Sequence, residues 1–365
     1  MAEQSRLGHP RMQLAHEPRL DPRLLAVVSQ YHLDRTGALS SLSALSPGST
    51  LDEVGASMAD AGEIFENIYE RLPDRLLRDR FELAVEVRPE TITNSDGSHT
   101  KLQIYRPTIK GGALPCVVYC HGGGAGVSFM TANNNIHRRW CVSLAAQGMI
   151  VVSVEYRNAY DKVSGFHPFP AALNDVCAAV HFVYTRRELL STRNIVLHGD
   201  GGGAGLVLAA AIKAGREGWI SRIDGIYAYS PLISNAYSWI EGRKLAELPS
   251  LVECHGYVTS VDCLAYMAHL YTPRSGDAMN PLAWPYHATQ EDLAGLPPHV
   301  LAMDELSPLR SEGEAYTRKL VRAGVKAVGR VILGSVQGAC LSFRQAVPEM
   351  QQDLVRHVAA FAKQV

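Results

Sequence analysis

Six short segments, in which almost every residue is apolar, constrain the possible folds of this chain more than any other feature of the sequence. They lie at residues 115–120, 149–156, 194–199, 223–230, 298–303 and 328–334. Segments of this kind are typical of β-strands that are buried on both faces of a sheet. Sequence with helical character separates most of them, and strands that alternate with helices predict a parallel sheet joined by right-handed crossovers. We therefore expect an α/β fold.

The flanking regions are expected to complete this core and to cover it. Residues 1–80 are predicted to be helical, with cap candidates at Asp21 and at Ser49 or Thr50. Alternating apolar and polar residues at 81–92 and 101–107 predict two antiparallel strands joined by a turn. We divide the chain into an N-terminal helical cap segment (1–80), a core (81–234 and 286–365) and a cap insertion (235–285). Ligands of open α/β folds bind at the carboxyl ends of the strands, and we expect the cap to cover that edge.

Composition argues against several classes of function. The 365 residues carry a formal net charge of -1 at pH 7, so neither nucleic acid nor an anionic membrane is an expected partner. The sequence has no apolar stretch long enough to span a membrane, and its first residues lack the apolar core of a secretory signal. The 7 cysteines form no Cys-x-x-Cys pair, which favours buried, reduced thiols. We expect a cytoplasmic protein without a metal or a cofactor.

The glycine-rich sequence YCHGGGAG, at residues 119–126, directly follows an apolar segment. Glycines at such a place allow backbone N–H groups to approach an oxygen on which negative charge develops. A histidine followed by three glycines after the third strand resembles the oxyanion loop of lipases and esterases. The alternative is an ordinary glycine-rich turn. On the first interpretation Gly123 and Gly124 donate hydrogen bonds, and His121 and Gly122 lie next to the ligand.

A second glycine-rich sequence, HGDGGGAG at residues 198–205, lies between an apolar segment and an alanine-rich helix. A strand, a sharp turn and a helix in this order are the setting of the nucleophile elbow G-x-S-x-G, which presents a serine at its apex. Here the apex residue is Gly201. Glycines at a helix N-terminus also bind phosphate, but the Gly-Lys-Ser/Thr of a phosphate-binding loop is absent, so nucleotide binding is the weaker alternative.

Together these motifs make the chain similar to the bacterial hormone-sensitive-lipase-like esterases, which have the α/β-hydrolase fold. The similarity extends from about Pro18 to the terminal helix and includes the sequences VEYRNAY (154–160), HPFPAALNDV (167–176) and DELSPLRSEGEAY (304–316). It implies an eight-stranded, mostly parallel sheet with helices on both faces and a helical cap. It also implies a mostly apolar small-molecule ligand with a carbonyl group, and a homodimer, since members of this family often pair through a sheet edge.

The resemblance places the family's Ser-Asp-His triad on three residues that cannot perform its chemistry. The serine position is Gly201. The acid position, in the sequence ELSPLRSEG, is Ser307, and a second aspartate of the family is replaced by Ser311. The base position, in the sequence GSVQG, is Gln337. The chain contains no intact G-x-S-x-G that could replace this motif.

Other residues remain candidates for a site. The N–H groups of Gly123, Gly124 and Gly202 are the expected donors of an oxyanion-type site. The expected ligand-pocket residues are His121, Gly122, Asp200, His198 and Tyr156. For His198 a core or ligand-facing position is favoured over a displaced base, because it precedes the turn by three residues. We expect His357 to lie at the surface, and Cys340 to be a packed thiol rather than a nucleophile.

Efficient ester hydrolysis through an acyl-enzyme is not expected, because loss of the nucleophile or the base alone costs on the order of 10⁶ in kcat. Three functions remain. The first is a non-hydrolytic enzyme for cyclisation, elimination or isomerisation of an apolar carbonyl compound, as known for relatives of this fold in natural-product biosynthesis. The second is a small-molecule binding protein or receptor, since the plant gibberellin receptor resembles this family and has lost hydrolysis. The third is a weak or residual carboxylesterase.

Overall fold

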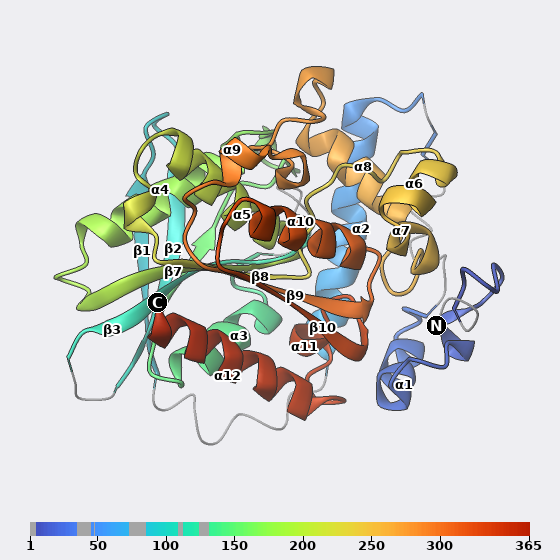
Figure 1. The fold of residues 1–365 in the computed structure, drawn as a ribbon, viewed down its shortest axis with the longest axis horizontal. Helices are drawn as coiled ribbons and strands as arrows, with labels where there is room; N and C mark the ends of the chain where they lie inside the picture. The colour runs from blue at the N-terminus through green and yellow to red at the C-terminus, as the bar shows by residue number, and fades with distance from the viewer. Residues whose placement is uncertain (1–4, 35–44, 47, 73–84, 109–111, 124–130) are drawn as a thin grey trace.

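A single eight-stranded sheet forms the centre of the computed structural model, which describes residues 5–34, 45–46, 48–72, 85–108, 112–123 and 131–365 (Figure 1). The strand order is β1-β2-β4-β3-β7-β8-β9-β10. Strands β1 (Val85–Thr93) and β2 (His99–Pro107) are antiparallel to their neighbours. The remaining strands are parallel: β3 (Leu114–Cys120), β4 (Ile150–Glu155), β7 (Thr192–Asp200), β8 (Gly225–Tyr229), β9 (His299–Leu306) and β10 (Ala327–Val336). A separate two-stranded sheet contains β5 (Tyr160–Asp161) and β6 (Gly165–Phe166).

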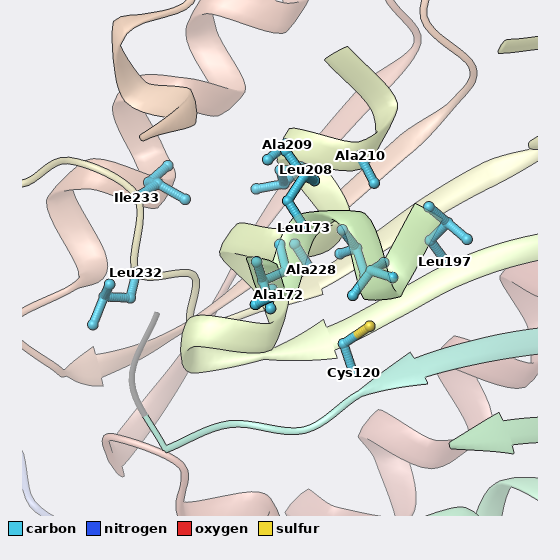
Figure 2. Packing of buried hydrophobic residues seen from close by; sticks show 14 of the residues in the cluster. Cys120, Ala172, Leu173, Leu197, Leu208, Ala209, Ala210, Ala228, Leu232 and Ile233 are labelled. Carbon is cyan, nitrogen blue, oxygen red and sulfur yellow. The ribbon is translucent and has the colours of Figure 1, made fainter. Parts of the chain in front are cut away.

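Helices cover both faces of the sheet, as the sequence predicted. Helices α4 (Ala171–Thr185), α5 (Gly201–Arg216) and α10 (Arg310–Arg322) lie on one face, with the short α9 (Gln290–Leu293). Helices α3 (Asn135–Ala145), α11 (Ala339–Ser342) and α12 (Pro348–Gln364) lie on the other. Alternate side chains of β3 enter two different clusters, with Val118 on the α5 face and Val117 on the α12 face. This alternation explains why the central strands are apolar at every position. Figure 2 shows part of the first cluster.

The remaining helices gather at the end of the sheet where β9 and β10 terminate (Figure 1). They are α1 (Pro22–Gln30), α2 (Leu51–Arg71), α6 (Glu241–Glu247), α7 (Ser250–Glu253) and α8 (Val261–Tyr271). Thr50, one of the two expected caps, begins α2 with a capping box to Glu53, and Asp21 caps α1. Arg19 connects the N-terminal segment to α7 through an ion pair with Glu253 at 2.9 Å. Among the described residues, no helix combines the length and apolar character that crossing a bilayer requires.

One expectation about the sheet was wrong. The segment 328–334 was expected to be buried on both faces, but β10 is an edge strand. Val328, Val331 and Leu333 are exposed there, Leu333 to 70%. In the described part of the chain no further strand pairs with β10, so its apolar side chains remain at the surface.

The N-terminus of α5 packs directly on the end of β3. A Cβ atom added at Gly203 would lie 2.1 Å from the carbonyl oxygen of Cys120 and 2.4 Å from that of His121. Backbone atoms cannot give way to such a contact as a flexible side chain does, so only glycine allows this approach. The approach brings the turn at Gly201 next to the loop that begins at His121.

We expect Gly203→Ala to destabilise the protein by roughly 2–3 kcal/mol, because the new methyl group would displace α5 from the sheet. Gly215→Ala in the same helix is the matched control. Its Cβ would meet only Leu296 Cδ2, at 3.4 Å, and it should gain about 0.5–1 kcal/mol from the better helix propensity of alanine. Urea denaturation of both variants measures the two effects as shifts in midpoint at constant slope. A Gly203→Ala protein as stable as the wild type would contradict the close packing.

Buried Glu312 of α10 anchors the segment that leads from β8 to α6. Its carboxylate accepts hydrogen bonds from the Ile233 N–H at 2.7 Å, from the Ser234 hydroxyl, and from the Tyr237 hydroxyl at 3.2 Å. Burial raises the pKa of Glu312 to about 8, against the opposing effect of these three donors. The group is therefore protonated in the folded protein at neutral pH.

The raised pKa of Glu312 predicts a loss of stability with rising pH. Between the pKa of an unfolded glutamate, about 4.3, and about 8, the folded state binds a proton that the unfolded state lacks, so the free energy of unfolding falls as pH rises. Glu312→Gln keeps the shape but cannot ionise. We expect the free energy of unfolding of this variant to fall by roughly 3 kcal/mol less than that of the wild type between about pH 5 and pH 8. Denaturation at both pH values tests this, and parallel stability curves would contradict it.

Candidate active site

The first part of the predicted oxyanion loop is held from two sides. The N–H of Gly122 donates to Asp200 Oδ1 at 3.0 Å. The Tyr156 hydroxyl donates to the carbonyl oxygen of His121 at 2.7 Å, and the two rings stack with centroids 4.3 Å apart. Gly123 has a φ of 114°, which favours glycine. Gly124, the other expected donor of this loop, lies outside the described residues. The His-Gly-Gly sequence is thus fixed next to the end of β7.

The apex of the second glycine-rich turn faces this loop. Gly201 has a φ of 52° and starts α5 directly after β7. A Cβ atom at Gly201 would lie 3.7 Å from Gly122 Cα and 4.0 Å from the nitrogen of Gly123. The N–H of Gly202 is in the first turn of α5, where backbone donors have no partner within the helix. The space above Gly201 is therefore next to the N–H groups of Gly123 and Gly202. A Cβ atom at this position would make only van der Waals contacts of normal length.

Ser307 and Gln337, which are thirty positions apart in the sequence, form a side-chain pair. Ser307 follows β9 and Gln337 follows β10, so both lie at the carboxyl ends of neighbouring parallel strands. The Ser307 hydroxyl donates to Gln337 Oε1 and accepts from the Leu309 N–H at 3.0 Å. Ser307 is fully buried, whereas Gln337 is partly exposed. The structure thus brings together the residues predicted at the acid and base positions.

Asp304, which sequence analysis did not identify, connects the end of β9, just before Ser307, to the end of β8 and to the loop after β10 that carries Gln337. Its buried carboxylate accepts hydrogen bonds from the hydroxyls of Tyr229 and Ser335 at 2.8 Å, from Ser230 at 2.9 Å and from the Gly338 N–H at 2.9 Å. Burial raises the pKa of Asp304 to about 6, while these donors oppose the rise. The only signal in the sequence is an aspartate within an apolar strand, since a buried carboxylate requires hydrogen-bond donors.

Asp200 is the second carboxylate of the site, with a side chain that is 14% exposed, and its partners were also missed. The Tyr119 hydroxyl donates to Asp200 Oδ1 at 2.5 Å, and His137 Nδ1 lies 2.8 Å from the same hydroxyl oxygen. Because that hydroxyl proton points to Asp200, His137 is the donor in the second contact. Burial raises the pKa of Asp200 to about 7, although Tyr119 and Gly122 favour its ionised form.

The structure decides between the two expected positions of His198 and corrects the expectation for His357. His198, a ligand-pocket candidate, lies in the core: Trp140 Nε1 donates to its Nε2 at 2.9 Å, and its Nδ1 is 2.8 Å from the carbonyl oxygen of Tyr227. His357 is partly buried rather than at the surface, with Nδ1 3.1 Å from the Tyr227 hydroxyl. Cys340 is buried, and burial raises its pKa, as expected for a packed thiol. Among the described residues, no group of His, Cys, Asp and Glu could hold a metal ion.

Comparisons with known proteins agree on the type of protein. A family model described as alpha/beta hydrolase fold matches residues 117–340. Carboxylesterase NlhH of Mycobacterium tuberculosis (strain ATCC 25618 / H37Rv) is 30% identical over 260 residues, which cover 69% of this chain and 75% of the relative. Brefeldin A esterase, named as a bacterial homologue of human hormone sensitive lipase, is 40% identical with a TM-score of 0.93 and coverage of 98% of this chain and 97% of that chain. Esterase Est22 is 29% identical with a TM-score of 0.83, over 97% and 100% of the two chains. The predicted α/β-hydrolase fold is confirmed.

We expect Ser307→Ala to destabilise the protein by about 1–3 kcal/mol, because the buried Leu309 N–H and Gln337 Oε1 would both lose their partner. Ser95→Ala, at an exposed serine in the turn between β1 and β2, is the control and should change stability by less than about 0.5 kcal/mol. Chemical denaturation compares the two variants. Equal stability of the two would show that the Ser307–Gln337 pair is not formed.

Proposed function

We propose that this chain, which belongs to the α/β-hydrolase fold family, is a non-hydrolytic enzyme of that family. In this proposal Gly201, Ser307 and Gln337 stand at the three triad positions. The substrate is a mostly apolar small molecule with a carbonyl group, and the reaction is a cyclisation, an elimination or an isomerisation. The donors Gly123 and Gly202, with Gly124, polarise the carbonyl oxygen.

The observation that carries this proposal is the combination of residues at the three triad positions, none of which can act as an activated nucleophile or a base. Gly201 offers no nucleophile, although the site has space for one. Gln337 accepts the hydrogen bond of Ser307 and remains neutral, so it cannot remove a proton as histidine does. Acyl transfer requires an activated nucleophile and a base, and loss of either costs on the order of 10⁶ in kcat. The arrangement therefore favours chemistry without an acyl-enzyme.

The backbone part of the site supports catalysis of another kind. The loop at His121–Gly123 keeps its fixed position beside the turn, through the hydrogen bonds from Gly122 to Asp200 and from Tyr156 to His121. One preorganised donor of this type contributes roughly 3–4 kcal/mol to stabilisation of a transition state. Holding a flexible substrate near its reactive conformation contributes several kcal/mol more. Both effects accelerate intramolecular reactions of a carbonyl compound without a nucleophilic side chain.

Two further candidates each have a specific observation in their favour. The two relatives named above, carboxylesterase NlhH and brefeldin A esterase, are esterases, which favours a residual carboxylesterase. The lack of a proton-transferring side chain in the Ser307–Gln337 pair favours a binding protein or receptor. For all three functions we propose a cap that comprises residues 1–80 and 235–285. We also propose that the protein forms a homodimer through the exposed apolar edge of β10.

Hydrolysis of p-nitrophenyl butyrate and labelling by a fluorophosphonate separate these functions. We expect the wild type and Gly201→Ser to hydrolyse near the buffer rate and to remain unlabelled. The triple variant Gly201→Ser, Ser307→Asp, Gln337→His should be labelled, and its rate should rise by about 10²-fold or more, since the triad acts as a unit. A wild-type kcat/KM of roughly 10⁴ M⁻¹s⁻¹ or more, typical of enzymes, would contradict the proposal and identify an esterase.

Incubation with small-molecule extracts, followed by mass spectrometry, distinguishes an enzyme from a receptor. A compound that is converted to a product of equal mass, or of a mass lower by one water, supports cyclisation, isomerisation or elimination. A compound that is retained by the protein and recovered unchanged favours the receptor. The triple variant is the control, since it should shift the outcome for esters toward hydrolysis.

A further inference from the structure

The Gln337 amide faces Ser307 with its oxygen. The Ser307 hydroxyl donates to Gln337 Oε1, and the same hydroxyl oxygen accepts from the Leu309 N–H. The two N–H groups of Gln337 Nε2 are therefore on the other side of the amide. Among the described residues, none accepts a hydrogen bond from this nitrogen or from the N–H of Gly123. The base position of the fold thus presents a donor where a hydrolase has an acceptor.

Two carboxylates near the Ser307–Gln337 pair already accept hydrogen bonds from the protein. The Asp304 carboxylate accepts from three hydroxyls and the Gly338 N–H. Glu305 Oε2 accepts from the Gly334 N–H at 2.8 Å. Ser307 and Ser311 are neutral, although the family resemblance places aspartates at both positions. Gly123, Gly202 and Gln337 each have an N–H group available to a ligand. An anionic oxygen pair matches such a set of donors better than a neutral ester does.

We propose that the ligand presents a carboxylate to this site, so that the protein recognises an apolar acid rather than an ester. One carboxylate oxygen accepts from the backbone donors at Gly123 and Gly202, and the other accepts from the amide of Gln337. The missing side chain at Gly201 leaves the space that the carboxylate occupies. This inference rests on the proposed function, since it concerns the same site, and it names the class of ligand.

The carboxylate of Asp200 lies directly behind the loop and opposes a second negative charge. It accepts from Gly122, the residue before the donor Gly123. The titratable groups that face it come from α2, β3 and α3 and are Tyr69, Tyr119, Cys120, His137 and Cys141. Burial raises the pKa of the tyrosines and thiols and lowers that of His137, so all of them are neutral near pH 7. Asp200 is thus the group of this cluster whose charge changes near pH 7.

Binding of an anion should be coupled to proton uptake at Asp200. Its pKa of about 7 in the free protein rises further when a carboxylate binds nearby, because two like charges disfavour ionisation. Below this pKa the proton is already present and affinity does not depend on pH. Above it each binding event takes up a proton, so affinity falls by up to about tenfold per pH unit.

Isothermal titration calorimetry with 4-phenylbutyrate and its methyl ester tests the inference at about pH 6. We expect the acid to bind roughly tenfold more tightly than the ester, since hydrogen bonds to a charged group contribute about 1.5–3 kcal/mol. Gln337→Glu should weaken acid binding by about tenfold or more, because it places a negative charge beside the carboxylate of the ligand. Gln290→Glu, at the first residue of α9, makes the same change of charge elsewhere and should affect neither probe.

The outcomes separate this inference from the proposed function. Equal or tighter binding of the ester, or unchanged acid binding by Gln337→Glu, overturns the carboxylate inference and leaves the proposed function standing. Release of phenylbutyrate from the ester by the wild type overturns the proposed function alone. Failure of both probes to bind overturns the carboxylate inference alone. Titrations in buffers of different ionisation enthalpy should show proton uptake above about pH 7 in the wild type but not in Asp200→Asn. Equal uptake in the two proteins would exclude Asp200 as its source.

Discussion

The contact between the N-terminus of α5 and the end of β3 sets the geometry on which the rest of the site depends. Gly203 lies against the carbonyl oxygens of Cys120 and His121, where no Cβ atom would fit. Because protein interiors are close-packed, a larger residue there would shift the whole helix rather than one side chain. The backbone alone therefore places the turn at Gly201 beside the N–H of Gly123.

Side chains from other strands stabilise the loops around the turn, whichever residue stands at position 201. Asp200 holds the loop after β3 through Gly122, and Asp304 holds the loops after β8 and β10 through hydroxyl groups and the Gly338 N–H. Neither carboxylate depends on a side chain at Gly201. The positions of the N–H donors therefore do not depend on the residue at position 201, and the same fold is compatible with different reactions.

Features that depend on neighbouring residues were predictable from the sequence, and features that depend on distant contacts were not. The two glycine-rich turns, a helix cap at Ser49 or Thr50 and the parallel core all follow from local patterns, and the structure identifies Thr50 as the cap. The role of Tyr119 could not be predicted, because its partner Asp200 is 81 positions away. The exposure of β10 was missed because an apolar segment does not reveal whether another strand will pair with it. The choice between core and ligand for His198 depended on Trp140, which is on a different element.

A neutral pair at Ser307 and Gln337 changes what this corner of the site can do without changing its shape. A histidine ionises near neutral pH and moves protons, whereas an amide only donates and accepts hydrogen bonds. Neither the hydroxyl nor the amide is charged, so burying this pair carries no free-energy cost of charge desolvation that a neighbouring group would have to offset. The Ser307 hydroxyl contacts both the Leu309 N–H and the Gln337 amide, which holds the pair in one arrangement. In the function that we propose, this pair orients a ligand without ionising, which suits a site that recognises an oxygen rather than one that transfers an acyl group.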